Sequence, residues 1–365
     1  MQLHRFEIYA RRFLACAAAM AVAVCVGAPV TRVRGADVSS AAAPSSQSEP
    51  QVTAETAVAM DADTGQIYYQ KNMHQQMYPA SITKIMTGLL TVERGKPGDA
   101  VTIQPDIGKS QSRDYTNIAL QPGEQLTEEQ LLYTMFLASA NDSAQALAEQ
   151  IGGSVDNFVA LMNARAKELG GTDTSFSNPN GLPDVNNKTS AHDMALIAAQ
   201  AVKTDELKYF GAEHYTLPAT NLRTKPEAFT TLVKMLRHDS KYYYSDIIAA
   251  KSGWTVMSGY TLVTVAKRDS RTVVCVVMKS SDGVAVMTDS KTLLDYAFTQ
   301  KQIVPEKTTP AVQRAESTVQ AAVDRTGHRS TPDWTRWEMV LTASGVAAVM
   351  VMLVIIRRRA RTRRV

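Results

Sequence analysis

Three short motifs that could do chemistry together follow one another along the chain. They are Ser81-Ile82-Thr83-Lys84, Ser139-Ala140-Asn141 and Lys251-Ser252-Gly253. The set supplies a nucleophilic hydroxyl, two amines, a second hydroxyl and an amide. A serine hydroxyl is a weak nucleophile that needs a neighbouring base, and a lysine serves as that base only when burial or a nearby cation lowers its pKa. The three motifs therefore predict acyl transfer through a serine.

The first two motifs depend on helices for their positions. Ser81 opens an apolar helical pattern, so we expect it in the first turn, with Lys84 one turn later on the same face. Ser139 falls in a turn between two helical stretches, where its hydroxyl can relay a proton to a leaving group. Asn141 can hold Lys84 through its carbonyl or donate to a substrate amide. Taken singly, both motifs also fit ordinary helix caps.

The third motif is expected in the turn that precedes a strand. Lys251 and Ser252 there can bind a substrate carboxylate, and Gly253 allows the backbone to approach closely. The amides of Ser81 and Trp254 can pair to hold an oxyanion. Taken alone, this motif also fits a turn with a surface lysine.

The elements that must position these residues indicate an α+β fold. Apolar segments on either side of turn residues predict a hairpin near each end of the globular region. Amphipathic stretches in between predict helices. The expected strands are 56–60, 66–70, 260–265 and 272–277, and the expected helices are 127–138, 142–151, 155–169, 191–201 and 289–299. An antiparallel sheet built from both chain ends around a helical middle follows.

The two ends of the chain have compositions typical of a targeting signal and of a membrane anchor. Residues 1–36 place arginines before an apolar run, as secretory signal peptides do, without an evident cleavage site. A low-complexity linker (37–50), a catalytic domain (51–302) and a stalk (303–336) are expected to follow. Residues 337–356 are apolar enough to cross a bilayer, and the arginine-rich tail 357–365 predicts a cytoplasmic C-terminus. We therefore expect a single-pass cell-membrane protein whose catalytic domain is extracytoplasmic.

Charge and composition exclude several function classes. The formal net charge is +4, but the basic ends account for more than that and leave the body at about −6, so no nucleic-acid partner is expected. Only Cys275 lies outside the signal segment, in an apolar run typical of a buried strand. No disulfide framework follows from it, and the histidines lack metal-ligand spacing. The sequence leaves the oligomeric state open.

The sequences around the motifs identify a family. The segments 60–65 (MDADTG), 79–87 (PASITKIMT), 176–182 (FSNPNGL), 190–195 (SAHDMA) and 250–255 (AKSGWT) closely resemble serine-type D-Ala-D-Ala carboxypeptidases, the low-molecular-mass penicillin-binding proteins. The resemblance spans about residues 53–301. It implies the penicillin-recognising serine-transferase fold, shared with β-lactamases and transpeptidases, with the active site at the edge of the sheet.

The resemblance also implies the roles of the site residues. It makes Ser81 the acylated nucleophile and Lys84 its general base. Ser139 and Asn141 would complete proton transfer and substrate alignment. Lys251, Ser252 and Thr255 would bind the terminal carboxylate, beside Gly253 and Trp254. The implied enzyme uses no metal or organic cofactor, removes the terminal D-alanine from peptidoglycan stem pentapeptides and is acylated by β-lactam antibiotics.

The chain departs from the family pattern in ways that leave alternatives. Ser252 stands where threonine is usual, the segment after 303 is too short for the second β domain of many members, and the arginine often found after the last strand is missing from 280–285. A DD-endopeptidase that cuts crosslinks would carry the same motifs. A weakly active penicillin-binding scaffold protein is a second alternative. A class A β-lactamase would use a deacylating glutamate, and the segment 176–183 has none.

Overall fold

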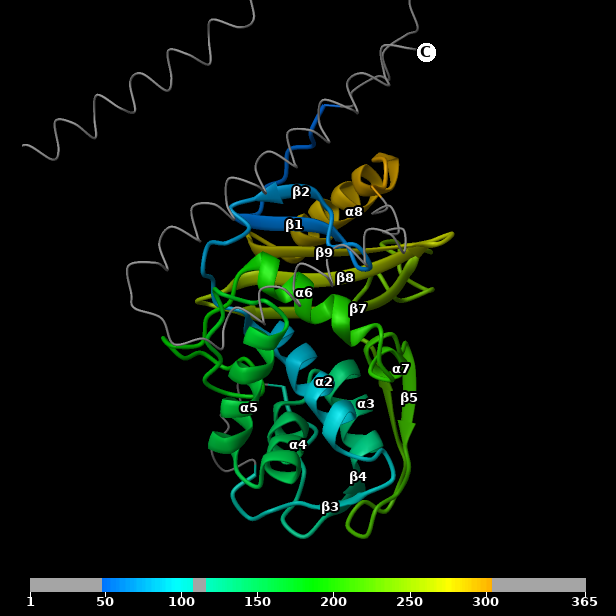
Figure 1. Cartoon of the computed structure of the whole chain (residues 1–365). Coiled ribbons are helices and arrows are strands. Elements are labelled where there is room, and N and C mark those ends of the chain that lie inside the picture. Colours follow the sequence, from blue (N-terminus) through cyan, green and yellow to red (C-terminus); the bar gives the residue numbers. More distant parts are fainter. Residues whose placement is uncertain (1–47, 108–115, 304–365) are drawn as a thin grey trace, which may run out of the picture. The chain divides into compact units, whose positions relative to one another are not determined.

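The computed structural model describes residues 48–107 and 116–303, which form an α+β architecture (Figure 1). Its centre is an antiparallel five-stranded sheet in the order β2-β1-β9-β8-β7. The strands are β1 (Thr56–Asp61), β2 (Ile67–Lys71), β7 (Ile247–Thr255), β8 (Gly259–Arg268) and β9 (Arg271–Ser280). The first and last parts of the domain thus meet in one sheet, as the two predicted hairpins require, and β7 forms one of its edges.

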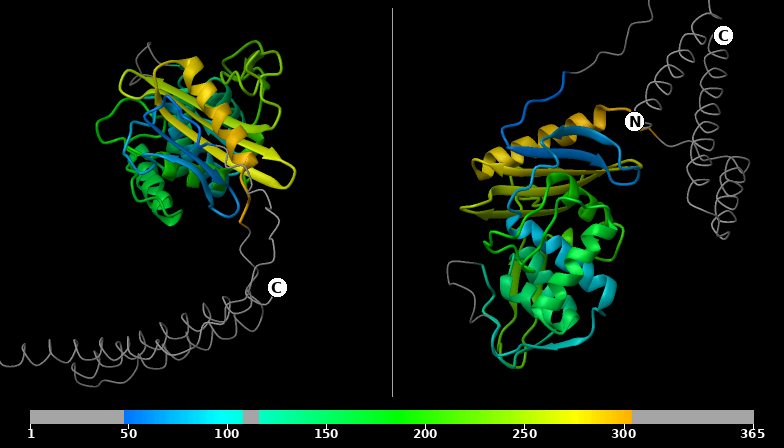
Figure 2. Two further views of the ribbon diagram at one scale, coloured as in Figure 1. Left: turned by 90° about the horizontal axis from the view of Figure 1, so that it is seen from above. Right: turned by 60° about the vertical axis from the view of Figure 1, so that its left-hand side comes forward.

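The sheet is covered on both faces. Helix α8 (Gly283–Thr299) packs on one face, while α6 (Ala191–Ala201) packs on the other, against β1, β8 and β9 (Figure 2). Because successive strand residues point to opposite faces, Val274 and Val276 of β9 join the core beneath the helical region. Cys275 and Val277 join the core beneath α8. Burial of both faces explains why β9 is a continuous apolar run, and the prediction of a buried Cys275 is confirmed.

The helical region lies between β2 and β7 in the sequence. It contains the 3-10 helix η1 (Ala80–Thr83), α2 (Lys84–Arg94), α3 (Glu128–Leu137), α4 (Asn141–Gly152), α5 (Val155–Glu168), α6 and α7 (Leu207–Phe210). Local signals set several of these boundaries. Thr127 and Gln130 form a reciprocal capping box on α3, and Gly153 ends α4 in the left-handed conformation before Ser154 caps α5.

Two small strand pairs complete the domain. β3 (Ala100–Thr102) pairs with β4 (Gln125–Thr127), and β5 (His214–Leu217) pairs with β6 (Glu227–Thr230), in both cases antiparallel. Figure 1 places β3 and β4 at the end of the helical region remote from the sheet, while β5 runs along its side beside α3. Both pairs are too short to give a periodic signal in the sequence, and they were not predicted.

Three predicted boundaries need correction. The third motif lies inside β7 and not in a turn before a strand. Ser81 lies in η1 rather than in the first turn of an α-helix. Helix α8 begins at Gly283, six residues earlier than predicted, because Asp282 caps it by accepting from the amides of Val284 and Ala285.

The predicted signal, stalk, membrane span and basic tail lie outside the described residues. Within residues 48–107 and 116–303, no helix is both long and apolar enough to cross a membrane.

Candidate active site

Ser81 and Lys84 face each other at the start of α2. A 3-10 helix has three residues per turn, so side chains at i and i+3 eclipse one another. Lys84 Nζ consequently lies 3.1 Å from Ser81 Oγ. The predicted pairing of nucleophile and amine is present, although a 3-10 turn and not an α-helical turn creates it.

The surroundings of Lys84 favour its neutral form. The side chain is fully buried, and its Nζ also donates to Asn141 Oδ1 at 2.7 Å and to the Asn180 carbonyl at 2.6 Å. Burial and the nearby ammonium of Lys251 hold the pKa of Lys84 well below its ordinary value, while the carboxylate of Asp142 opposes this shift. A neutral amine has two N–H groups and one lone pair. Asn141 and Asn180 take the two N–H groups, which leaves the lone pair for the proton of Ser81.

Lys251 forms the second pair of the site with Ser139. It enters from β7, where only 1% of its surface is exposed. Its Nζ donates to Ser139 Oγ at 2.9 Å and to the Ser252 carbonyl at 2.8 Å. Burial lowers the pKa of Lys251 to about 7. Burial thus lowers the pKa of both lysines, and the charge of Lys251 lowers that of Lys84 further.

The backbone of the first motif packs closely against the backbones at Gly253 and Gly181. A Cβ at Gly253 would lie 2.7 Å from the Ser81 amide nitrogen. A Cβ at Gly181, whose φ is +83°, would lie 1.9 Å from the Ala80 carbonyl oxygen. Only glycine fits at these two positions. The strand β7 and the loop around Gly181 therefore enclose the nucleophile between two backbones.

Strained backbone lies directly before Ser81 and at Ser139. Ala80, directly before the nucleophile, has φ +50°, and Ser139 has φ +57°. Non-glycine residues adopt this region at an energetic cost, and such residues cluster at functional sites. The hydroxyl of Thr261 holds the turn before Ser81 by donating to the Pro79 carbonyl at 3.0 Å.

The remaining residues of the third motif point in different directions. Ser252 is half-buried and lines a cavity of about 410 Å³ between β7, β8 and the start of α8. Trp254 is 56% exposed, with its ring 6.1 Å from that of Tyr260. Thr255 is buried, and its hydroxyl bonds to Ser258 in the turn between β7 and β8. The substrate contacts expected of these three residues stay predictions.

Three residues of the site were missed at the level of sequence. Asn180 contributes a backbone carbonyl, which no side-chain motif reveals. Asp142 directly follows the second motif, and its charge acts on Lys84. Thr261 supports Ser81 from β8 across 180 residues of sequence, and only the sheet pairing brings them together.

The assembled geometry suits acyl transfer by a serine. Ser81 has a neutral amine to take its proton, and Lys251 beside Ser139 offers a cation and a second hydroxyl. Among the described residues, the structure groups no three His, Cys, Asp or Glu side chains as metal ligands.

Comparison with known proteins finds relatives that share one description. The family model described as D-alanyl-D-alanine carboxypeptidase matches residues 43–282. The chain is 34% identical over 257 residues to the D-alanyl-D-alanine carboxypeptidase DacF of Bacillus subtilis, covering 69% of this chain and 64% of that protein. It is 29% identical to DacB2 of Mycobacterium tuberculosis, covering 68% of this chain and 84% of that protein. The chain spans less than two thirds of the length of DacF and of two further D-alanyl-D-alanine carboxypeptidases that it matches.

Solved structures share the fold. A mutant of a Streptomyces DD-transpeptidase matches with a TM-score of 0.64 and 27% identity, covering 69% of this chain and all of that one. A D-alanyl-D-alanine carboxypeptidase from Mycobacterium tuberculosis matches with a TM-score of 0.63 and 25% identity, covering 73% of this chain and 97% of that one. The motifs, the paired lysines and the family match lead to one conclusion: the chain belongs to the D-alanyl-D-alanine carboxypeptidase family.

Proposed function

We propose that this protein is a serine D-Ala-D-Ala carboxypeptidase that removes the terminal D-alanine from peptidoglycan stem pentapeptides. The observation that carries the proposal is the buried Lys84, whose Nζ lies 3.1 Å from Ser81 Oγ and whose pKa is held well below its ordinary value. A lowered pKa favours the neutral amine, which is the form of lysine that acts as a general base. The family match supports the choice of substrate.

Acylation begins with attack of Ser81 Oγ on the carbonyl carbon of the penultimate D-alanine. Lys84 takes the serine proton as the new C–O bond forms. The oxyanion of the tetrahedral intermediate would be held by the amides of Ser81 and Trp254, a type of contact worth about 2.7–4 kcal/mol of barrier. The carboxylate of the leaving D-alanine would lie against Lys251 and Ser252.

Collapse of this intermediate needs a proton on the leaving nitrogen. Ser139 is suited to give it, because its hydroxyl already accepts a hydrogen bond from Lys251. The proton on Lys84 restores the Ser139 hydroxyl, D-alanine departs as the free amine, and an ester remains on Ser81. Water activated by Lys84 then hydrolyses the ester, which releases the shortened peptide and the serine. A β-lactam presents a strained amide to the same serine and would form the corresponding ester.

Release of D-alanine from a pentapeptide substrate tests this function directly. The wild-type protein should release one D-alanine per peptide, and Ser81→Ala should release none while keeping its melting temperature. Ser143→Ala is a matched control, since Ser143 is buried on α4 near the second motif but bonds to Thr134. Continued D-alanine release by Ser81→Ala would sink the proposal.

We also propose the cellular arrangement that the sequence predicts: export by the N-terminal segment, anchoring by residues 337–356 and an extracytoplasmic catalytic domain. The apolar run and the arginines after it support this arrangement. Protease treatment of intact wall-free cells should digest the domain and protect the C-terminal tail. Digestion of an epitope on the tail, with the domain protected, would reverse the orientation.

A further inference from the structure

The segment 116–120 is wrapped around the N-terminus of α4, beside the second motif. The Asn141 amide donates to the Thr116 carbonyl at 2.9 Å. The Asp142 amide donates to Asn117 Oδ1 at 3.2 Å. The two residues that open α4, one of them a partner of Lys84, therefore have their backbone amides fixed by this segment.

Asp142 binds the segment in return. The residue is 1% exposed, and its carboxylate accepts from the amide of Ile118 at 3.1 Å and from that of Leu120 at 3.0 Å. Ala119 between them has φ +55°, a conformation that costs alanine energy. The hydrogen bonds from the amides of Ile118 and Leu120 to the Asp142 carboxylate thus stabilise the strained turn at Ala119.

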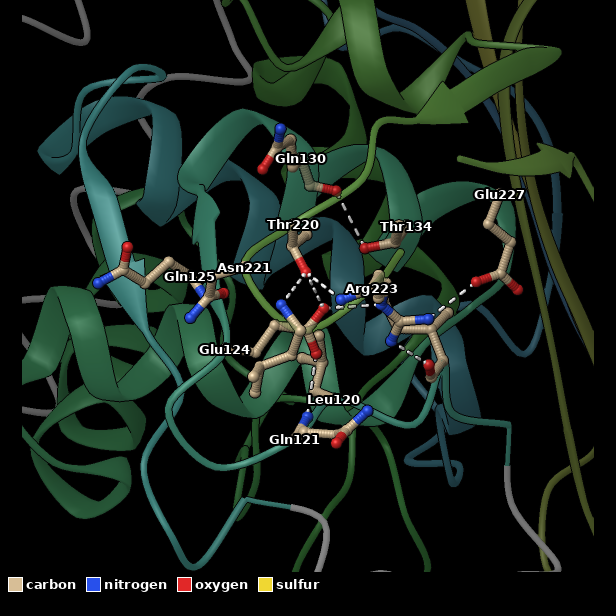
Figure 3. A network of polar contacts seen from close by, with 12 residues as sticks. Leu120, Gln121, Glu124, Gln125, Gln130, Thr134, Thr220, Asn221, Arg223 and Glu227 are labelled. Carbon is tan, nitrogen blue, oxygen red and sulfur yellow. Dashed lines mark hydrogen bonds and ion pairs between the residues drawn. The ribbon is translucent and has the colours of Figure 1, made fainter. Parts of the chain in front are cut away.

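Arg223 holds the same segment from the opposite side. It lies in the connection between β5 and β6, and its Nη2 donates to the Ile118 carbonyl at 2.5 Å. Its Nε donates to Glu124 at 2.7 Å, and its Nη1 donates to Glu227 at 2.8 Å (Figure 3). The backbone of Ile118 is therefore held at its amide by Asp142 and at its carbonyl by Arg223.

Glu124 holds the guanidinium of Arg223 in one position. Its side chain is fully buried, and it also accepts from the Thr220 hydroxyl at 2.9 Å and the Gln121 amide at 3.1 Å (Figure 3). The side chain of Arg223 is only 15% exposed. A partly buried carboxylate–guanidinium pair with further hydrogen bonds has a well-defined geometry. The planar guanidinium then directs an Nη2–H group toward the Ile118 carbonyl.

We propose that Arg223 is a positioning residue for acyl transfer: through the Ile118 carbonyl it sets the turn bound by Asp142, and so the place of Asn141 against Lys84. This inference rests on the proposed function, because it assigns Arg223 a part in the chemistry of Ser81. Arg223 touches neither Ser81 nor Lys84 in any described contact, so its effect reaches them through two hydrogen-bonded segments.

The test is the acylation of the full-length protein by a chromogenic penicillin, with the acylation rate constant and the dissociation constant of the non-covalent complex measured separately. Arg223→Met should lower the rate constant about tenfold and change the dissociation constant less than twofold. Arg223→Lys, which can still donate to the Ile118 carbonyl, should recover part of the rate. A purely structural role would lower the melting temperature without this split.

Two controls separate positioning from general destabilisation. Arg165→Met removes an arginine that is 21% exposed and bidentate to Glu93, and Glu227→Gln removes only the charge of the outer partner of Arg223. Both should acylate at the wild-type rate. If Arg223→Met does not fold, the double variant Glu124→Gln with Arg223→Met leaves no unpaired buried charge and carries the same expectation.

Wild-type acylation rates in the folded Arg223 variants would overturn the inference, as would an equal loss in Arg165→Met. Failure of the proposed function is distinguishable from this result. It would appear as a wild-type protein that releases no D-alanine, whereas penicillin acylation still reports on Ser81 and Lys84.

Discussion

At the scale of single residues, the site brings together two lysines whose pKa values are both lowered by burial. Lys84 is surrounded by acceptors and has no carboxylate in direct contact among the described residues. Burial therefore outweighs the attraction of Asp142 and lowers the pKa of Lys84. Burial lowers the pKa of Lys251 to about 7, so its charged form is lost as the pH rises above about 7. The charge of Lys251 also favours the neutral form of Lys84, because two nearby buried cations repel.

The two pKa directions predict the pH dependence of acylation by an anionic penicillin. Lys84 must be neutral, so the rate falls as pH drops through its lowered pKa. Lys251 must be charged, so the rate also falls as pH rises above about 7. Lys251→Arg stays charged and should lose the alkaline decline while keeping the acid one. Rate constants from pH 5 to 10 check this, and an unchanged alkaline decline in Lys251→Arg would contradict it.

Ser252 provides a second prediction at this scale. A hydroxyl that binds a carboxylate is worth about 1.5–3 kcal/mol, so Ser252→Ala should lower kcat/KM for the pentapeptide about tenfold or more. Ser252→Thr keeps the hydroxyl and should stay within about threefold of wild type. Steady-state D-alanine release measures both. Equal activity of the alanine and threonine variants would show that the hydroxyl binds no substrate.

At the scale of elements, the site is the meeting place of η1, the α3–α4 turn, the loop at Gly181 and the edge strand β7. The pairings between them are made by backbone, through Gly253 against Ser81 and Gly181 against Ala80. Such contacts allow no side chain to intervene. The position of the nucleophile is therefore decided by the packing of whole elements.

Glycine substitutions test this packing. Gly181→Ala should displace η1, lower the melting temperature and slow acylation by about tenfold or more, since a misplaced reacting group is costly. Gly65→Ala is the matched control, because Gly65 also has a positive φ (+72°) but open space around it. It should cost only about 1–2 kcal/mol of conformational strain and leave acylation unchanged. Calorimetry and penicillin labelling measure both effects, and similar acylation in the two variants would refute the packing argument.

The sequence was most informative where an element carries its own boundary signals. Helix α6 was predicted at its observed bounds, residues 191–201, and the structure shows Ser190 capping it by accepting from the Asp193 amide. Strand β7 was missed because a buried lysine and a glycine interrupt its apolar pattern, and both are there for the site. Asn180 binds Lys84 through its backbone carbonyl, and Arg223 binds Glu124 in a segment about 100 residues away in the sequence. No local pattern encodes contacts of this kind.

At the scale of the whole domain, stability and activity reside in different layers. Helix α8 buries Leu293 and Leu294 against the face of the sheet opposite α6. Site residues from η1, α4 and the α3–α4 turn lie on the α6 side. Loss of packing under α8 should therefore weaken folding more than chemistry.

Leu294→Ala tests this separation. Truncation of a fully buried leucine costs about 2–5 kcal/mol, which should lower the melting temperature by about 5–15 °C in a domain of this size. Lys291→Ala, on the exposed side of the same helix, should stay within about 0.5 kcal/mol of wild type. Below the transition both variants should be acylated at the wild-type rate. A large loss of acylation in folded Leu294→Ala would contradict the separation of layers.

The central claim is that Ser81 becomes acylated, and intact-mass analysis with peptide mapping after incubation with a fluorescent penicillin tests it most directly. The expected result is one lasting adduct per chain, located on Ser81 and absent from Ser81→Ala. An intact drug with no adduct would mean that the site is inactive as built. A hydrolysed drug with no lasting adduct would make the protein a β-lactamase, and either of these results would contradict the account.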